Sequence, residues 1–459
     1  MTPSYIPISA LLAVGRPDDF LICVDGDRKI TWREFSLRVG GIARALAGRG
    51  ERRWLIHCEN PLNFVCAMLA VLHTGGNAVI APGLQRGMVE RLRYAFDAIV
   101  TEDNLEGVNV NTTEPTHFDF APVQMRAAQV ELFTSGSSGA PKRVPKSLAQ
   151  LERETSVLDA CWGPQAAGTT TVATVPHNHI YGMLFRLFWP LSGGRAFDTA
   201  LCADPSILLD RMRLAGNAIL ISSPAHLTRL PEIMPLTSLN PAARMIFSSG
   251  GPLPSATAAE FDSQLGESPT EVYGSTESGG IAWRRQTAGE HGAAWNPFSG
   301  MVLRLDDEAA LCVRSPYLAG DEWLTMGDGA RILPDGRFML QGRLDRVVKI
   351  EGVRASLPEI EDGLRQHPWV IEAAVLPLLG RKQALGAVIV LRDTTRLKEA
   401  GRSVLITALR QFLLERFERV LVPRQWRFIE KLPIDARGKL PAAELTALFE
   451  QKPDAPTAS

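Results

Sequence analysis

Two hydrophobic periods alternate along the first part of the chain. Residues 20–24 and 29–30 have the alternating pattern of short strands, and the sequence Asp25-Gly26-Asp27 between them is typical of a hairpin turn. Thr31 and Glu34 then predict a capping box at the start of a helix. The apolar residues that follow recur at helical spacing and predict one buried face: Trp32, Phe35, Val39, Ile42 and Leu46.

The alternation of strand-like and helix-like hydrophobic patterns continues to about residue 300. Predicted strands lie at 54–58, 77–81, 98–101, 169–176, 218–222 and 245–247. Predicted helices lie at 61–73, 84–96, 181–191, 205–215, 226–230 and 255–265. Strands that alternate with helices indicate βαβ units around parallel sheets, so we expect an α/β domain. From 300 to 341 the pattern becomes short β-hairpins, with a turn at Pro334-Asp335-Gly336.

A domain boundary is predicted near Gly342. Beyond it the pattern gives strands at 347–350, 370–376 and 385–391 and a helix at 402–419. Ser356-Leu357-Pro358-Glu359 has the cap, proline and acid that begin a helix. We therefore expect a large domain over 1–342, made of βαβ-type sheets and a β-hairpin region, and a smaller, mobile α+β domain over 343–459.

Composition narrows the class of protein. A chain of 459 residues is too long for one compact core, and a formal net charge of −1 argues against a nucleic-acid-binding protein. The six cysteines are scattered, no secretory signal is evident, and the longest apolar run, 64–72, is too short to span a bilayer. We expect a soluble, cytoplasmic protein.

The segment from Arg343 onward carries 20 Lys/Arg against 15 Asp/Glu. This excess suits nucleotide phosphates or an acidic partner, and equally a solvated surface.

A small-residue loop is the first candidate site. The apolar run 130–133 leads into Thr134, Ser135, Gly136, Ser137, Ser138 and Gly139, and Lys142 follows. Glycines, hydroxyls and a lysine together suit a phosphate, although such loops are also common as linkers. The spacing is not that of the Walker phosphate loop, and Pro141 would obstruct a helix beginning inside the loop.

Further short motifs follow in order. They are Tyr273-Gly274-Ser275-Thr276-Glu277, Met326-Gly327-Asp328, the run from Gly342 to Gly352, and the run from Leu432 to Leu440. Together with the loop at 134–142 they closely resemble the adenylate-forming superfamily, which contains acyl- and aryl-CoA synthetases, adenylation domains and luciferases. The resemblance covers nearly the whole chain.

The resemblance implies an ATP-dependent enzyme. Such enzymes activate a carboxylic acid as an acyl-adenylate with release of pyrophosphate, and most then transfer the acyl group to a thiol of CoA or of a carrier-protein phosphopantetheine. The loop from Thr134 to Lys142 would hold the β,γ-phosphates, Thr276 the α-phosphate, and Glu277 a Mg²⁺ ion. Asp328 and Arg343 would bind the ribose. The remaining nucleotide-binding residues would be Ser249, Gly250, Gly251, Pro252, Tyr273, Gly274 and Ser275.

The resemblance also assigns residues to the two half-reactions. Lys439 would bridge the carboxylate and the nucleotide as the catalytic lysine. Asp345 would be the hinge about which the small domain rotates, and Lys349 would belong to the thiol passage. By alignment on Pro176 and Gly182, His179 would lie beside the carboxylate as a gate or pocket residue.

The acid itself is less well defined. Residues 176–182 hold no aspartate for a substrate ammonium group, which disfavours an amino acid. Tyr181, Met183 and Phe247 suit an apolar or aromatic acid, but packing of a helix face explains them equally well.

Two residues depart from the family pattern, and three functional readings stay open. Ser138 replaces the usual threonine and Arg143 the usual glycine. The chain is also short for the family, and a reduced large domain with a basic small domain is compatible with delivery to a carrier protein rather than to CoA. The alternatives to an acid–thiol ligase are an adenylation protein that stops at the adenylate and a non-catalytic nucleotide-binding relative. The retained Glu277, Asp328 and Lys439 argue against the last.

Overall fold

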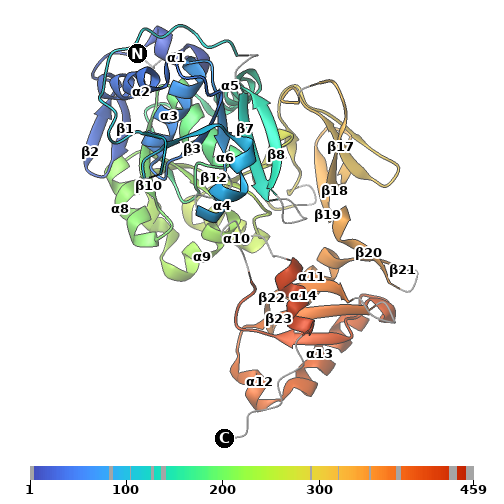
Figure 1. Ribbon diagram of the computed structural model, residues 1–459. Coiled ribbons are helices and arrows are strands. Elements are labelled where there is room, and N and C mark those ends of the chain that lie inside the picture. The colour runs from blue at the N-terminus through green and yellow to red at the C-terminus, as the bar shows by residue number, and fades with distance from the viewer. Residues whose placement is uncertain are drawn as a thin grey trace, which may run out of the picture. The chain divides into compact units, whose positions relative to one another are not determined.

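The chain forms two compact units in a computed structural model (Figure 1). The structure describes residues 5–81, 86–103, 105–125, 129–135, 141–289, 292–318, 320–350, 353–378, 384–433 and 442–450. The first unit contains Met1–Val302 and Val313–Leu324, and the second contains Leu303–Cys312 and Thr325–Ser459. By this division the hairpin region groups with the C-terminal residues. The functional boundary at 342/343 stays a prediction.

A nine-stranded sheet dominates the first unit. Its strand order is β15-β14-β13-β12-β11-β9-β10-β1-β2. The six strands from β13 to β1 are parallel, and antiparallel strands close both edges. The bounds are β1 Leu21–Asp25, β2 Arg28–Thr31, β9 Thr170–Ala173, β10 Ala196–Leu201, β11 Ala218–Ser222, β12 Ala243–Ser249, β13 Thr270–Ser275, β14 Gly279–Arg284 and β15 Asn296–Pro297.

A second sheet of six strands has the order β6-β5-β3-β4-β7-β8. Its strands are parallel except for the final hairpin of β7 and β8. The bounds are β3 Arg53–His57, β4 Asn77–Ile80, β5 Ala98–Thr101, β6 Val108–Asn109, β7 Gln129–Ser135 and β8 Pro141–Ser147. The α/β class with parallel sheets is thus confirmed, whereas β8 was not predicted because its two prolines hide the strand pattern.

Helices form layers on both faces of the nine-stranded sheet. Alternate residues of β11 point to opposite faces: Ile219 and Ile221 join the apolar cluster that includes both sheets, whereas Leu220 joins an outer cluster. The helices whose residues belong to the shared cluster are α1 (Ile8–Val14), α2 (Trp32–Leu46), α3 (Pro61–His73), α5 (Leu148–Trp162) and α7 (Trp189–Ser192). The helices of the outer cluster are α8 (Pro205–Ala215), α9 (Pro224–Ile233) and α10 (Ser255–Leu265).

Two predicted helices differ in detail from the structure. The helix expected at 84–96 is observed as α4 (Arg86–Arg91) followed by a 3₁₀ turn, Arg93–Ala95. The helix expected at 181–191 is present, but its middle, Met183–Phe188, is π-helical between α6 (Ile180–Gly182) and α7. A π-helical segment is wider than an α-helix and often occurs near functional sites.

The second unit contains three small sheets. Their strand orders are β16-β17-β18-β19, β20-β21 and β22-β23-β24. The strand bounds are β16 Val302–Leu305, β17 Ala310–Arg314, β18 Leu324–Ile332, β19 Phe338–Arg343, β20 Val347–Ile350, β21 Val353–Ser356, β22 Val370–Leu378, β23 Ala384–Leu391 and β24 Gln425–Phe428. The helices are α11 (Leu357–Arg365), α12 (Thr395–Glu399), α13 (Arg402–Leu414) and α14 (Ala442–Glu450). The sheet β22–β24 has apolar clusters that include α11 and α13 in one and α14 in the other, which agrees with the predicted α+β arrangement.

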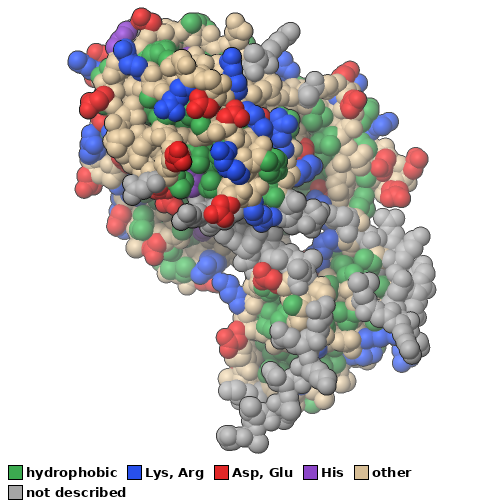
Figure 2. All heavy atoms as spheres, viewed as in Figure 1, with side chains coloured by type: hydrophobic (Ala, Val, Ile, Leu, Met, Phe, Trp, Pro, Cys, Tyr) green, Lys and Arg blue, Asp and Glu red, His purple; other side chains and the backbone are tan. Residues whose placement is uncertain are grey.

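The surface agrees with the balanced composition. Acidic and basic side chains are interspersed over the face seen in Figure 2. In the described part of the chain, no helix is both long and apolar enough to cross a membrane.

Candidate active site

The β7–β8 hairpin carries the base of the predicted phosphate loop. Its register pairs Thr134 with Lys142 and Ser135 with Pro141. The loop residues Gly136, Ser137, Ser138 and Gly139 lie outside the described part of the chain, as does the side chain of Ser135. The structure therefore places the two ends of the loop beside each other.

Arg143 now has a structural explanation. Its Nε donates to Oε2 of Glu131 at 2.7 Å, and Arg53 of β3 donates to the same oxygen at 2.8 Å. Glu131 is only 1% exposed, and a buried carboxylate is costly unless charged hydrogen-bond donors such as these compensate its burial. Arg143 thus joins β8 to β7 through Glu131, to which Arg53 of β3 also bonds, and this accounts for the charged residue at a position where the family usually has glycine.

Several candidate residues follow the carboxyl ends of neighbouring parallel strands. His179 comes after β9, Ser249–Pro252 after β12, and Ser275–Glu277 after β13. Because parallel strands end at one edge of a sheet, these segments lie along the same edge. In open α/β sheets this edge is where ligands bind.

Residues 249–252, at the end of β12, have open space around their backbone. The Ser249 hydroxyl donates to the Val272 carbonyl at 2.8 Å, which ties the end of β12 to β13. Gly250 has φ +92°, and a Cβ added at Gly251 would meet only Pro224, at 3.9 Å. The backbone of these exposed glycines is therefore accessible to a flat ligand, in keeping with the nucleotide-binding role predicted for them.

The turn after β13 is closely packed beneath Thr276 and Glu277. A Cβ at Gly274 would lie 2.2 Å from the carbonyl oxygen of Gly279, so only glycine fits there. The Ser275 amide donates to Ser278 Oγ at 3.0 Å, and the Ser278 amide donates to Ser275 Oγ at 3.1 Å. Tyr273 packs against Trp295 with ring centroids 5.5 Å apart. This turn presents Thr276 and Glu277 on a fixed backbone.

Lys142 connects the two sheets at the site. Its Nζ lies 2.6 Å from Oε1 of Glu277, although 135 residues separate the two in sequence. Burial disfavours the charged form of Glu277, but the hydrogen bond and charge of Lys142 outweigh it and lower the pKa of this carboxyl group. The phosphate hairpin and the Thr276-Glu277 turn therefore form one site.

Glu277 fits the role of a Mg²⁺ ligand. An ionised, partly exposed carboxylate is a suitable donor for a hard cation. Among the described residues, no group of three or more His, Cys, Asp or Glu is arranged to hold a metal ion. A single carboxylate matches the way Mg²⁺ usually binds beside nucleotides, with water and phosphate oxygens completing its coordination.

His179 begins the helical segment behind the edge. It has extended backbone angles, φ −121° and ψ 151°, immediately before α6. On the next turns Tyr181 packs on Phe185 at 4.8 Å between ring centroids, and Phe185 packs on Phe247 at 5.3 Å. Phe185 and Phe247 are buried core residues, so of the aromatic residues proposed for the acid pocket Phe247 also has a packing role.

Gly182 is required by the path of the chain at this point. A Cβ there would lie 1.9 Å from the Pro176 carbonyl oxygen. We expect Gly182→Ala to lower the free energy of unfolding by about 2–4 kcal/mol, because the backbone of 176–182 must move to relieve the overlap. Urea unfolding of the variant measures this. Gly50→Ala is the control, since a Cβ at Gly50 meets nothing within 4 Å; equal losses in both variants would contradict the steric explanation.

His177 makes stability depend on pH. Burial, helped by the charge of Arg186, lowers the pKa of His177 to about 3, and its ring bonds the Cys58 carbonyl at 3.1 Å. The folded-state pKa is below the unfolded value, so the stabilisation is complete above pH ~6.5 and falls by at most about 1.4 kcal/mol per pH unit below it. We expect His177→Asn to flatten the fall measured by urea unfolding between pH 7.5 and 5. The exposed His117→Asn should retain the wild-type slope.

The second unit holds the predicted ribose-binding pair. Asp328 of β18 and Arg343 of β19 are register partners, and their Oδ2 and Nη1 atoms lie 3.9 Å apart. A Cβ at Gly327 would lie 2.7 Å from the Arg343 guanidinium, so glycine at 327 leaves room for that side chain. The structure thus brings Asp328, Arg343 and Gly327 together within one hairpin.

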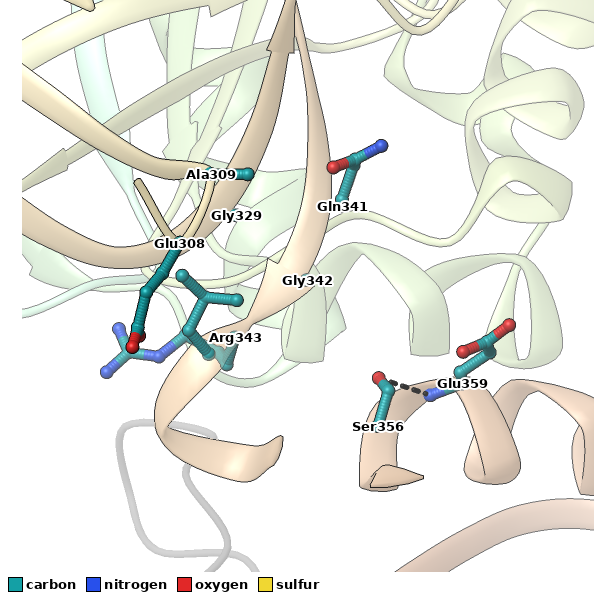
Figure 3. A pocket seen from close by; sticks show the side chains of 9 residues that line it. Glu308, Ala309, Gly329, Gln341, Gly342, Arg343, Ser356 and Glu359 are labelled. Carbon is teal, nitrogen blue, oxygen red and sulfur yellow. Dashed lines mark hydrogen bonds between the residues drawn. The ribbon is translucent and has the colours of Figure 1, made fainter. Parts of the chain in front are cut away.

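The remaining predicted residues are described only in part. Asp345 lies in the 3₁₀ turn Leu344–Arg346 and Lys349 in β20, but their side chains are outside the description. Lys439 lies outside the described residues altogether. A cavity of about 220 Å³ adjoins residues 341–344, at the start of the 3₁₀ turn Leu344–Arg346 (Figure 3). Among its lining residues are Glu308, Gly329, Gly342, Arg343, Ser356 and Glu359.

Two residues at the site were not predicted. Lys146 of β8 donates to the Glu277 carbonyl, and Glu154 of α5 accepts from the Gly280 amide. Lys146 shares a strand face with buried Val144, so a lysine at an inward strand position was the available signal. Glu154 gave none, because an acid on a helix is usually exposed.

Comparison with known proteins supports one family. The sequence model of the AMP-binding enzyme family matches residues 85–320, and that of the AMP-binding enzyme C-terminal domain matches 359–439. A 4-coumarate–CoA ligase from Rhodobacter capsulatus is 31% identical over 324 residues, which are 70% of this chain and 77% of the relative.

Solved structures share the fold. ATP-bound MatB from Rhodopseudomonas palustris superposes with a TM-score of 0.79 at 18% identity, over 97% of this chain and 99% of that one. A benzoate CoA ligase from Burkholderia xenovorans gives 0.78 at 21% identity, over 96% and 100%. With both family models matched in order and a relative that is 31% identical over 70% of this chain, the chain belongs to the AMP-binding enzyme family of the adenylate-forming superfamily.

Proposed function

We propose that this protein activates a carboxylic acid with ATP, releases pyrophosphate, and transfers the acyl group from the acyl-adenylate to the thiol of CoA or of a carrier-protein phosphopantetheine. The observation that carries the proposal is the Lys142–Glu277 contact. It joins a phosphate-loop lysine to a carboxylate suited to Mg²⁺ at the ligand-binding edge of the sheet. Family membership supplies the reaction class.

In the first half-reaction, charge must be neutralised before a carboxylate approaches the α-phosphate. Lys142 would leave Glu277 and pair with the β,γ-phosphates beside Thr134 and the loop 135–139. Glu277 would then be free to bind Mg²⁺, which supplies further positive charge when present. The Thr276 hydroxyl would bond the α-phosphate, and Lys439 would stabilise the carboxylate as the new bond forms.

Two groups of residues suit the nucleoside. The open backbone of 249–252 and the strand residues Tyr273–Ser275 suit the adenine, and Asp328 with Arg343 suits the ribose hydroxyls. Asp345 would serve as the hinge that exchanges Lys439 for the segment containing Lys349. That exchange separates adenylation from thiolation within one protein.

The acid is proposed to be aromatic or otherwise apolar. Tyr181 follows His179 by two residues and packs on Phe185, and residues 176–182 hold no aspartate for an ammonium group. The relatives named as 4-coumarate and benzoate ligases act on aromatic acids, which agrees with this class. His179 would lie at the mouth of the pocket.

An ATP–pyrophosphate exchange screen tests the proposal. Purified protein is incubated with Mg²⁺, ATP, labelled pyrophosphate and one acid at a time, from aliphatic and hydroxyaromatic series. Exchange with at least one aromatic acid is expected. Addition of CoA, or of a phosphopantetheinylated carrier protein, then shows which thiol accepts the acyl group. Exchange without transfer to either thiol would favour a protein that stops at the adenylate, and silence with every acid would favour a nucleotide-binding relative without catalysis.

A further inference from the structure

The backbone that carries Thr276 and Glu277 is held by bonds from outside its own turn. The Ser315 hydroxyl donates to the Ser278 carbonyl at 2.9 Å. The Gly280 amide donates to Glu154 Oε1 at 2.7 Å. Lys146 Nζ donates to the carbonyl of Glu277 itself, at 2.5 Å. Three separate segments therefore fix three successive points of this turn.

Lys146 is unusual because it is a buried cation that touches backbone oxygens. Only 3% of the residue is exposed, and its second bond, of 3.1 Å, goes to the Tyr317 carbonyl. Burying an ammonium group is costly unless hydrogen bonds and an opposite charge compensate. A lysine that served packing alone would be replaced at less cost by an apolar residue.

Glu154 is the acidic residue whose charge acts most strongly on Lys146. Burial raises the pKa of the Glu154 carboxyl group to about 7, and the Gly280 amide and the charge of Lys146 oppose that rise. The same carboxylate packs against Gly279, where an added Cβ would lie 2.6 Å from Oε2. The pair thus links β8, the strand after the phosphate loop, and α5 to the two ends of the Glu277 turn.

We propose that Lys146 and Glu154 are positioning residues for the nucleotide-bound Mg²⁺: they act through the backbone of Glu277 and Gly280 to hold the Glu277 carboxylate where the ion binds. The inference rests on the proposed function in assigning Mg²⁺·ATP to this site. Replacing a residue that orients a metal-binding side chain without touching the metal typically changes metal affinity or activity by about 10–100-fold.

The decisive variant is Lys146→Met/Glu154→Gln. Lys146→Met alone would leave a buried carboxylate uncompensated and destabilise the fold, whereas the double variant removes both charges and keeps an acceptor for the Gly280 amide. Two quantities are measured on the full-length protein: the affinity for ATP with and without Mg²⁺, by calorimetry, and the Mg²⁺ concentration that gives half-maximal pyrophosphate exchange. Thermal unfolding reports on the fold. Lys29→Met is the control, because Lys29 is an exposed residue of β2.

We expect the double variant to melt within a few degrees of the wild type, to bind ATP without Mg²⁺ as the wild type does, and to need at least about tenfold more Mg²⁺. A requirement within twofold of the wild type would overturn the inference. Should the double variant not fold, Ser315→Ala replaces it, because it frees the Ser278 carbonyl without changing charge; unaltered Mg²⁺ dependence there would also count against the proposal.

The test separates this inference from the proposed function. If the wild type exchanges pyrophosphate with no acid, the proposed function fails, but calorimetry still shows whether Mg²⁺ strengthens ATP binding and whether the double variant loses that effect. If the wild-type protein binds ATP with the same affinity with and without Mg²⁺, the positioning role is refuted directly.

Discussion

Replacing Glu277 with alanine is expected to lower the rate of ATP–pyrophosphate exchange by at least about 100-fold. Residues behind a metal ligand already cost about 10–100-fold when replaced, and Glu277 is proposed to touch the ion itself. The measurement is the exchange rate as a function of Mg²⁺ concentration with the best acid of the screen. Most of the loss should take the form of a raised Mg²⁺ requirement.

The fold should tolerate this substitution. Lys142, the partner of Glu277, is 61% exposed, so water solvates its charge when the carboxylate is removed. Ion pairs with this much exposure contribute about 0–1 kcal/mol, and the melting temperature should change little. Glu260→Ala on the exposed face of α10 is the matched control and should leave exchange unchanged. A Glu277→Ala protein with wild-type Mg²⁺ dependence would show that Glu277 is no metal ligand.

Replacing Lys439 with alanine is expected to separate the two half-reactions. Adenylate formation, measured by pyrophosphate exchange, should fall by about 100- to 1,000-fold, because a positive charge aimed at the forming bond is lost. Transfer of the acyl group from a supplied acyl-adenylate to the thiol should continue near the wild-type rate, since the proposed rotation removes this lysine from the site before transfer.

Lys431 provides the control for this prediction. It is an exposed lysine eight positions earlier in the same C-terminal segment, so Lys431→Ala tests whether any lost charge in this region slows exchange. Equal loss of both half-reactions in Lys439→Ala would indicate a general defect and contradict the assigned role.

Local sequence signals were sufficient for most of the secondary structure. Ser356 caps α11 by accepting from the Glu359 amide, as the run Ser356–Glu359 predicted. The capping box at Thr31 formed only in part. Thr31 accepts from the Glu34 amide, but the Glu34 carboxylate instead binds Arg28 and Arg38. The side chain found stronger charged partners from a neighbouring strand and the next helical turn, which the local motif does not include.

The candidate site likewise contains features that the sequence predicted and features that only the structure revealed. The motifs around Thr134, Ser249 and Thr276 were visible in the sequence because glycines and hydroxyls at fixed spacing have local conformational causes. The explanation of Arg143 was not visible, because Glu131 and Arg53 come from two other strands. Likewise the role inferred for Lys146 depends on carbonyl groups of Glu277 and Tyr317, 131 and 171 residues away.

The sequence by itself determined the alternation of strands and helices, the helix caps and the ordered motifs of the AMP-binding family, since each of these depends on residues within a few positions of one another. Only the tertiary structure decided which charges meet. The Lys142–Glu277 contact, the bond from Lys146 to the Glu277 carbonyl and the Arg53–Glu131 pair all join segments distant in the chain. Their partners are selected by how the two sheets pack. Burial makes the bonds of Lys146 and Glu131 necessary, because a charged group removed from water must find an opposite charge or a hydrogen bond.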